Sequence, residues 1–582
     1  MHHTSATPAR GATTSLQGRA LQSRALQGRA LQDRALQDRT PQDRAPGGTV
    51  LLRGGFVYSP ADPFATAMVV DGDTVAWVGS EGAADSFADG VDRVVRLEGA
   101  LVTPAFADAH VHTTATGLAL TGLDLSDARS LPEALSRTAA HAAGRPGDGV
   151  LLGHGWDETS WPERRPPTRA EVDEATGGRP LYLARTDVHS AVVSTALLDL
   201  VPGVADRPGY DPAGPLTRDA HHAVRGAAHA ALTPAQRAAA QRAALRHAAS
   251  RGIGSLHECA GPDISSEDDL TALLALAADE PGPRVHGYWA EPARTPGDLD
   301  RIRDLGAVGA GGDLFVDGSI GSRTALLHAP YADAGHTGVS HLDADTIARH
   351  LTLCTRAGVQ GGFHAIGDAA IAAVVDGVRA AASATGLDRV RALRHRVEHA
   401  ELMTAETIAA FAEFGLIASV QPAFDATWGG ADGMYAARLG TERAAALNPY
   451  AAMTRAGVPL VLGSDSPVTP LDPWGAVRAA AFHRTPAHRI SARAAFHAHT
   501  RGGWRAVGRD DAGVLVPGAP ADYAVWSVGD LVVQTPDERV ANWSTDPRSG
   551  TPGLPDLTPG GELPTALRTV VGGRTVYRPP NG

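Results

Sequence analysis

The stretch LTPAQRAAAQRAALRHAASRGIGSLHE, residues 232–258, contains one complete helix-to-strand unit. Thr233 and Gln236 have the spacing of an N-terminal capping box, and Gly252 is placed to end the helix that follows. The run IGSLHE then indicates a short strand that ends in two polar side chains, His257 and Glu258. The unit therefore predicts a helix that leads into a strand with reactive side chains at its C-terminal end.

The same order of helix, glycine and strand recurs along the chain. Gly358, Gly415 and Gly457 precede VQGGFHAIGD, LIASVQP and VPLVLGSDSP, respectively. This alternation predicts an α/β fold with parallel strands and crossover helices. About 400 residues suffice for a (β/α)8 TIM-like barrel with insertions. A doubly wound open sheet is the alternative, but no phosphate-binding glycine fingerprint follows an early strand.

The remaining sequence divides into further regions. Residues 1–47 carry LQxRA repeats whose leucines advance by about 140° per unit around a helix, so they form no apolar face and predict a disordered low-complexity tail. Residues 48–103 and 506–582 contain short β-branched runs and are expected to build one small flanking β-sandwich from both chain ends. The barrel is expected over 104–505, with an insertion at about 113–250.

Composition limits the classes of function. The net charge of −12 argues against nucleic acid or an anionic membrane surface as the main partner, and a small-molecule substrate is expected instead. No apolar run is long enough for a membrane span, and the first residues lack a signal-peptide core, so a cytoplasmic protein is expected. All 52 basic residues are arginine. Without lysine, neither a Schiff base nor a carbamylated lysine ligand can form.

Polar residues gather where the predicted strands end, which is where α/β barrels carry their active sites. His110 and His112 are two residues apart, so both side chains point to one side of a strand. His364, His399 and Asp465 end three later strands. A histidine pair alone is as often a surface or hydrogen-bonded pair as a metal site. This whole set, however, suits a divalent metal, with Zn²⁺ as the first choice and Fe²⁺ or Mn²⁺ as alternatives. The set suggests metal-assisted hydrolysis, with Asp465 moving the proton.

Several segments together resemble one enzyme family. TPAFADAHVHT, GGFHAIGDAA, RHRVEHA and LGSDSPV resemble the amidohydrolase superfamily, and LFVDGSIGSRTALLHAPYAD with SVQPAF narrows this to the amidohydrolase 3 (YtcJ-like, N-substituted formamide deformylase-like) family, over about residues 50–577. The resemblance implies a β-sandwich beside a (β/α)8 barrel and makes a homodimer possible. It implies that His110 and His112 bind one metal and His364 and His399 a second. It also implies that Asp465 is both a ligand and the proton shuttle.

The segment GGDLFVDGS, residues 311–319, departs from the family pattern. As an extended strand it would place Asp313, Phe315 and Asp317 on one face. At the position of Asp313, many relatives carry the lysine whose carbamate bridges two metals. Three alternatives follow. Asp313 itself bridges the two metals, or Glu258 bridges them instead. In the third, no residue bridges fully, so that one metal dominates or the two metals are bound unequally. Asp313 can also simply make a hydrogen bond to a neighbouring loop.

Other residues are predicted near the substrate with less support. The candidates for substrate binding are Asp187, His189, Asp317, Arg323, Gln421 and Trp156. Asp317 and Arg323 are expected to fix the loop after the fourth barrel strand, where Arg323 can also clamp a carboxylate. Trp428 is a further candidate for the pocket lining, and Phe424 makes the pocket more apolar.

The function expected from the sequence is hydrolysis of a non-peptide C–N bond, in an amide or a formamide. A lactone or other ester is the alternative substrate, because the same chemistry serves both. From another class, the chain could be a catalytically silent metal-binding scaffold, against which the complete set of four histidines and Asp465 argues.

Overall fold

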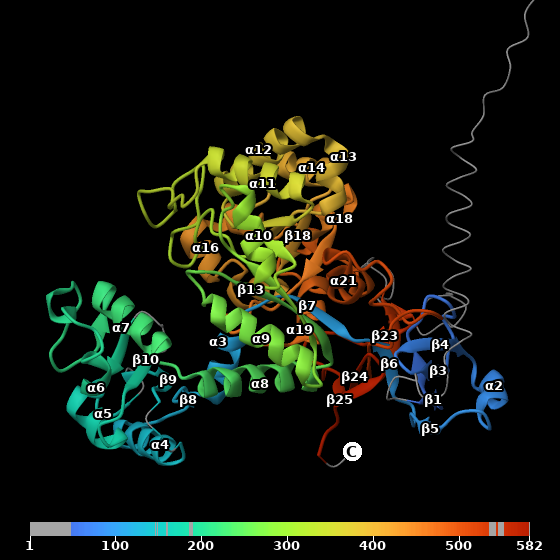
Figure 1. Cartoon of the computed structure of the whole chain (residues 1–582), viewed down its shortest axis with the longest axis horizontal. Coiled ribbons are helices and arrows are strands. Elements are labelled where there is room, and N and C mark those ends of the chain that lie inside the picture. The colour runs from blue at the N-terminus through green and yellow to red at the C-terminus, as the bar shows by residue number, and fades with distance from the viewer. Residues whose placement is uncertain are drawn as a thin grey trace, which may run out of the picture.

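The computed structural model describes residues 48–145, 147, 149–158, 161–185, 190–534, 543–544 and 552–580. Figure 1 shows a barrel ringed by helices, with a second α/β module on one side of it and a β-domain on the other. The repeat-containing tail predicted for residues 1–47 lies outside the described residues.

Eight parallel strands of the described chain form a nearly closed barrel, which confirms the predicted fold class; the open doubly wound sheet is wrong. In sheet order the strands are β7 (Phe106–Val111), β13 (Ile253–Ala260), β14 (Arg284–Trp289), β15 (Gly309–Ala310), β16 (Gln360–Ala365), β17 (Arg396–His399), β18 (Ile417–Val420) and β19 (Leu460–Leu462). The ring closes where Val111 forms a parallel bridge with Ser466, just beyond β19.

Helices cover the outside of the barrel. They include α3 (Thr113–Thr121), α8 (Pro234–Ser250), α9 (Glu267–Asp279), α10 (Pro296–Asp304), α11 (Ala344–Ala357), α12 (Asp368–Thr385), α13 (Leu387–Leu393), α14 (Ala405–Phe414), α15 (Pro422–Trp428), α16 (Met434–Leu439), α17 (Thr441–Ala445), α18 (Tyr450–Ala456), α19 (Pro473–Ala481), α20 (Ala492–His497) and α21 (Gly503–Ala506). The predicted capping box of Thr233 and Gln236 begins α8. No helix in the described part of the chain is both long and apolar enough to cross a bilayer.

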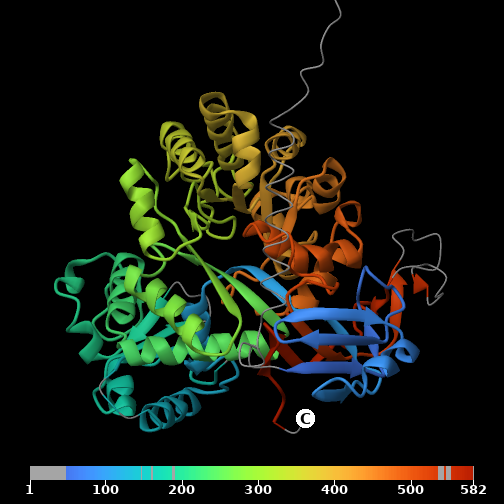
Figure 2. The same ribbon diagram turned by 45° about the vertical axis from the view of Figure 1, so that its right-hand side comes forward.

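Both ends of the described chain build a β-sandwich beside the barrel, as predicted. One sheet contains β1 (Thr49–Arg53), β3 (Ala67–Asp71), β4 (Thr74–Gly79) and β5 (Arg93–Arg96), and the other contains β2 (Phe56–Val57), β6 (Leu101–Pro104), β20 (Tyr523–Ser527), β24 (Thr565–Val571) and β25 (Arg574–Tyr577). Figure 2 shows the two sheets as layers. Leu52 and Met68 from the first sheet share one buried core with Val102 and Val525 from the second.

The C-terminal part also contributes a small sheet, β21 (Leu531–Gln534) with β22 (Trp543–Ser544) and β23 (Leu554–Pro555), and α2 (Glu81–Ala84) caps the sandwich near β1. An aromatic cluster joins the sandwich to the barrel. The ring of Trp474 from α19 lies 5.0 Å from Phe106 of β7 and 5.5 Å from Trp526 of β20. Burying a side chain of this size contributes about 1.5–3 kcal/mol, so the cluster holds the two domains together.

The region predicted as an insertion contains a sheet of its own. Its strands are β8 (Leu123–Asp124), β9 (Leu151–Trp156), β10 (Leu181–Arg185), β11 (Ser190–Val193) and β12 (Leu216–Thr217), and its helices are α4 (Leu131–Ala143), α5 (Arg169–Thr176), α6 (Thr195–Leu198) and α7 (Arg218–Ala230). Separate apolar cores lie on the two faces of this sheet. The insertion is therefore an independent module, which Figure 1 shows beside the barrel.

The prediction of an extended strand through residues 313–317 is wrong. β15 ends at Ala310, and the chain then continues as an irregular segment with one isolated bridge, between Phe315 and His364. Gly311 and Gly312 cause the break, because their φ angles are +121° and +75°, a region that other residues rarely adopt. A Cβ on Gly311 would lie 2.1 Å from the carbonyl oxygen of Gly362 on β16. The turn therefore brings the following residues close to β16.

Candidate metal centre

The strand ends bring the predicted ligands together at one mouth of the barrel. The side chains come from His110 and His112 at the end of β7, Asp313 after β15, His364 in β16, His399 in β17 and Asp465 after β19. Two of these residues have left-handed backbone conformations, with φ of +69° at His399 and +54° at Asp465. Such conformations cost about 1–3 kcal/mol each and concentrate at functional sites.

Three of the histidines are held by one ring nitrogen, and the other nitrogen faces the centre. His110 Nδ1 donates to Glu398 Oε2 at 2.9 Å, and His112 Nδ1 donates to the carbonyl of Cys259 at 3.0 Å. His399 Nδ1 donates to Gln421 Oε1 at 2.8 Å. These bonds fix the orientation of the rings and turn each Nε2 toward the centre, as the outer partners of metal-binding histidines do.

His364 has the opposite orientation. Its Nε2 lies 3.3 Å from the carbonyl oxygen of Gly318, and its Nδ1 faces inward. That Nδ1 lies 3.0 Å from Asp313 Oδ1. A carboxylate can only accept, so Nδ1 donates to Asp313 unless a metal ion takes the place of that proton.

Asp313 stands between the two histidine pairs. Its Oδ2 is 3.8 Å from His110 Nε2 and 3.6 Å from His112 Nε2. Its Oδ1 is 3.0 Å from His364 Nδ1 and 3.5 Å from His399 Nε2. Each carboxylate oxygen therefore faces a different pair, which is the arrangement that a bridging ligand requires.

Asp465 completes the first histidine pair. Its Oδ1 is 3.1 Å from His112 Nε2 and 3.4 Å from His110 Nε2. Ligands of a tetrahedral zinc ion, bound at 2.0–2.1 Å, lie about 3.3 Å apart. The spacing of these donor atoms therefore matches a divalent metal without movement of the backbone.

The charge in the centre also suits a cation. Burial acts to lower the pKa of His112, but its hydrogen bond to Asp465 and the nearby acids raise it to about 9. The pKa of His399 is raised to about 10 against burial, chiefly by Asp313 and Asp465. His110 Nε2 is buried and has no hydrogen-bond partner among the described residues. The residues thus stabilise positive charge at the centre, and they fit one or two divalent ions.

A buried ion pair lies beneath the centre. Arg396 of β17 donates from Nε to Glu398 Oε1 at 2.5 Å and from Nη2 to Oε2 at 2.8 Å. Arg396 also donates to the carbonyl of Ala109 and lies over the ring of Tyr288, 4.5 Å from its centroid. Burial raises the pKa of Glu398, but the charge of Arg396 outweighs it and lowers that pKa to about 2. Glu398 therefore stays ionised and holds His110 in place.

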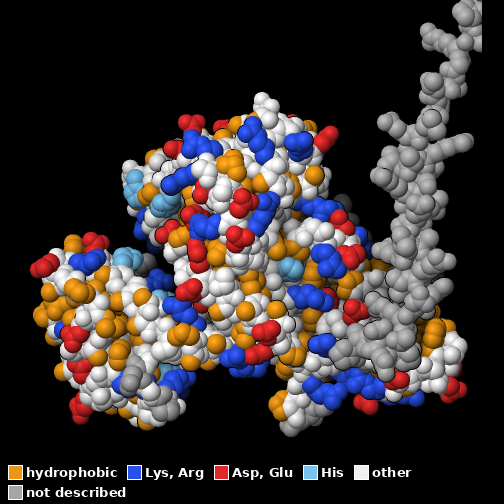
Figure 3. Space-filling model, viewed as in Figure 1, with side chains coloured by type: hydrophobic (Ala, Val, Ile, Leu, Met, Phe, Trp, Pro, Cys, Tyr) orange, Lys and Arg blue, Asp and Glu red, His pale blue; other side chains and the backbone are white. Residues whose placement is uncertain are grey.

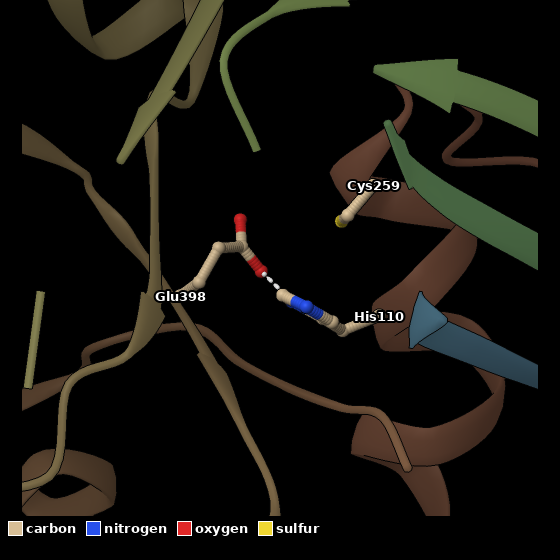
Figure 4. A group of neighbouring side chains, drawn as sticks. All are labelled: His110, Cys259 and Glu398. Carbon is tan, nitrogen blue, oxygen red and sulfur yellow. Dashed lines mark hydrogen bonds and ion pairs between the residues drawn. The ribbon is translucent and has the colours of Figure 1, made fainter. Parts of the chain in front are cut away.

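Figure 4 shows this support from inside the barrel, with Glu398 reaching His110 and Cys259 beside them. These three side chains also lie close enough to hold a metal ion. However, burial raises the pKa of the Cys259 thiol well above its ordinary value, so the thiolate that a metal needs is disfavoured. His110 Nδ1 is already bonded to Glu398. We therefore interpret this group as residues that orient His110 in the metal centre, and not as a metal site of its own.

The structure places the other predicted bridge, Glu258, outside the centre. Its Oε2 accepts a hydrogen bond from the backbone N–H of Thr113 at 2.7 Å, at the start of α3. Asp317 lies near His364 but accepts backbone N–H groups of Leu326, Ile366 and Gly367, so it ties its loop to the end of β16.

The predicted substrate contacts are spread over several places. Arg323 clamps a carboxylate of the chain itself, that of Asp333, with bonds of 2.9 and 2.7 Å. Trp156 is buried in the insertion, and its indole N–H donates to the carbonyl of Leu183. Asp187 and His189 lie outside the described residues.

An aromatic side chain lies against His399, one histidine of the second pair. The ring of Phe424 is nearly parallel to that of His399, with centroids 5.9 Å apart, and Trp428 packs 4.9 Å from Phe424. This side of the centre is apolar.

Gln421 contacts His399 and is therefore expected to act through it. Replacing Gln421 with leucine removes the acceptor that orients His399, so metal affinity or activity should fall about 10–100-fold. Metal titration of the apo-protein checks this, with Gln421→Glu as the control that keeps an acceptor. Equal affinities for the wild type and the leucine variant would contradict it.

Sequence reasoning missed Glu398 and Arg396. A signal was present, because both lie in the short strand RVEH, two residues apart and hence on one face. Two opposite charges on one face of a buried strand must pair with each other, since an unpaired buried charge is costly.

A cleft of about 560 Å³ lies between the barrel and the insertion, next to the centre. His112 and Glu258 line its barrel side, and α7 of the insertion lines the opposite side. Among the candidate metal ligands, His112 is therefore the one that this cleft reaches.

Comparisons of sequence and of structure both find relatives of this chain. The sequence model of the amidohydrolase family (Amidohydro_3) matches residues 93–577. The protein LONG AFTER FAR-RED 3 of Arabidopsis thaliana is 28% identical over 80% of this chain and 84% of its own length. The N-substituted formamide deformylase of Arthrobacter pascens is 25% identical over 71% of this chain and 80% of its own.

Among solved structures, an uncharacterized metal-dependent hydrolase from Pyrococcus furiosus is similar to this chain, with a TM-score of 0.70 and 27% identity. The similarity covers 82% of this chain and 98% of the other.

Proposed function

Because this chain belongs to the amidohydrolase family and is a hydrolase, we propose that it cleaves a non-peptide C–N bond, in an amide or a formamide, of a small-molecule substrate. The position of Asp465 carries the proposal, since its carboxylate lies against His110 and His112, and His112 lines the cleft. The relationship to an N-substituted formamide deformylase supports a C–N bond over an ester.

The residues that would hold the metal are the four histidines with Asp313 and Asp465, and we propose two ions, one for each histidine pair, with Asp313 within reach of both pairs. A divalent ion bound there lowers the pKa of water toward neutrality and polarises the scissile carbonyl. We take Zn²⁺ as the first choice, because three or more nitrogen and oxygen donors at tetrahedral spacing suit it.

The chain itself supplies proton transfer and orientation. Asp465 accepts the proton of the attacking water and then donates it to the leaving nitrogen, because an amine leaves poorly unless protonated. The left-handed backbone at Asp465 and the bond from its N–H to the carbonyl of His110 fix its direction. Glu398 and Gln421 hold the imidazoles of His110 and His399 in fixed orientations beside it.

Removing the metal is expected to abolish the activity reversibly. Dialysis against a chelator should reduce hydrolysis of N-formyl and N-acetyl amines more than about 100-fold, since several kcal/mol of transition-state stabilisation are lost. Adding back Zn²⁺, Mn²⁺ or Fe²⁺ should restore it, and amine release with metal analysis measures both. The proposal fails if the metal-loaded protein hydrolyses esters and lactones but no amide, or if the chelated protein keeps full activity.

A further inference from the structure

A second pocket lies at the opposite end of the barrel from the metal centre, and we call it the basal pocket. Its volume of about 450 Å³ is within the range of small-molecule sites. Three of its lining residues, Arg394, Gly415 and Val458, precede β17, β18 and β19, so the pocket lies where these strands begin. Its other wall comes from α20, from the π-helix Ala498–Gly502 and from α21. None of the candidate metal ligands lines it.

Among the residues that the structure describes, four arginines and no acidic residue line the basal pocket. The arginines are Arg391, Arg394, Arg501 and Arg505. The chain as a whole carries a net charge of −12, and acidic and basic side chains are interspersed on the face of the molecule that Figure 3 shows. The basal pocket is therefore a local concentration of positive charge on an acidic protein, and such a concentration attracts anions.

Two of these arginines share a carboxylate, and two do not bind one. Arg394 Nη2 is 2.6 Å and Arg505 Nε is 3.0 Å from the carboxylate of Asp510. Arg391 Nε donates to a neutral acceptor, a backbone carbonyl, at 2.7 Å. Arg501 is exposed, and within the described chain its guanidinium forms neither a hydrogen bond nor an ion pair. The side chains of Arg391 and Arg501 can therefore bind an anion without displacing a carboxylate of the protein.

Apart from the arginines, the lining of the basal pocket is uncharged and largely apolar. His497 is neutral there, because burial together with the charges of Arg493 and Arg501 lowers its pKa. The apolar side chains include those of Ile417, Val458, Leu460, Val461, Ile490 and Ala494. Such a lining suits a ligand with an apolar body and one anionic end.

The backbone beside Arg501 has an unusual conformation. Residues Ala498–Gly502 form a π-helix, a rare conformation that is found frequently at functional sites. Ala498, Arg501 and Gly502 all line the basal pocket. From the same turn, His499 Nδ1 donates to the carbonyl of Ala107 in β7 at 3.0 Å. The π-helix therefore holds Arg501 at the pocket while it is itself bonded to a barrel strand.

We propose that the basal pocket binds a small organic anion, in which a carboxylate or a phosphate group is attached to an apolar body such as an aromatic ring. Arg391 and Arg501 bind the anionic group, because the paired N–H groups of a guanidinium match two of its oxygens. The apolar lining contacts the body. Because the pocket and the metal centre lie at opposite ends of the barrel, this ligand is a different molecule from the one that is hydrolysed, and the inference does not depend on the proposed amide hydrolysis.

Three matched probes test the proposal. Phenylacetate and benzyl phosphate supply the two kinds of anion, and benzyl alcohol has the same ring without a charge. In equilibrium dialysis against the metal-loaded protein, at least one of the anions should bind about tenfold more tightly than benzyl alcohol, and the tighter of the two identifies the anionic group. Arg501→Gln should remove this difference, and Arg501→Lys should restore part of it. Equal binding of both anions and the alcohol would overturn the inference.

Two further variants locate the binding. Ala494→Phe places a large side chain in the apolar part of the pocket, so it should weaken binding of the anion about tenfold without a change of charge. Arg225→Gln, at an arginine of the cleft beside the metal centre, is the matched control and should leave the binding unchanged. The thermal unfolding midpoint of each variant shows that it is folded. Anion binding that Arg225→Gln weakens and Arg501→Gln does not would overturn the inference.

Chelation separates the basal pocket from the metal centre, because none of the candidate metal ligands lines the pocket. The tighter binding of the anion, and its loss in Arg501→Gln, should both persist after the metal is removed. Binding that disappears on chelation and is unchanged in Arg501→Gln would belong to the metal centre and would overturn the inference.

Discussion

Replacing Asp313 with alanine is expected to reduce the bound metal from two ions to at most one per chain and to lower kcat/KM about 100-fold or more. The reason is geometric, because one oxygen of Asp313 faces His110 and His112 and the other faces His364 and His399. Without this carboxylate, the second pair of histidines has no acidic ligand, since Asp465 contacts the first pair.

Metal analysis of the purified proteins together with amide hydrolysis measures this effect. Asp313→Asn keeps the shape and removes the charge, so it should lose the second ion while remaining folded. Asp432→Asn, at an exposed aspartate away from the centre, is the matched control. If Asp313→Ala keeps two ions and full activity, Asp313 is not the bridge. If the wild type itself holds one ion, a single dominant metal is the correct alternative.

The backbone conformation that positions Asp313 could not be predicted from the sequence. The resemblance drew attention to Asp313, but the strand that was expected to present this residue ends at Ala310. Two glycines with positive φ turn the chain toward β16 instead, and this displacement lets a short side chain lie between the histidines. Close backbone approach depends on the neighbouring strand, so a pattern of alternation in one segment does not predict it.

Local signals predicted much of the fold. The capping box of Thr233 begins α8, and Gly358, Gly415 and Gly457 end their helices in left-handed conformations, because these effects depend on a few adjacent residues. The barrel followed from the repeated order of helix and strand. The clustering of four histidines and Asp465 followed from the rule that parallel strands end at the same edge.

Features that depend on packing between distant segments were not predicted. The ion pair of Arg396 and Glu398 orients His110 only because β17 faces β7 across the barrel. The sequence of β17 alone does not show this contact.

Replacing Asp465 with asparagine is expected to lower kcat for amides about 10²–10⁴-fold, the usual contribution of a general acid or base. Asparagine keeps the size and one oxygen ligand, but it cannot accept the proton of water or return it to the nitrogen. His110, His112 and Asp313 remain as ligands, so most of the metal should be retained. Metal content, the thermal unfolding midpoint and kcat are therefore measured on the same preparation.

The leaving group separates the two roles of Asp465. An amine must be protonated as it departs, whereas p-nitrophenolate leaves without a proton, so Asp465→Asn should damage amide hydrolysis more than hydrolysis of a p-nitrophenyl ester. Equal losses on both substrates, together with lost metal, would mean that Asp465 serves as a ligand only. Unchanged amide turnover would show that the proton travels by another group. The larger loss on the amide is the result expected of a carboxylate that lies against His110 and His112 and is held there by a left-handed backbone.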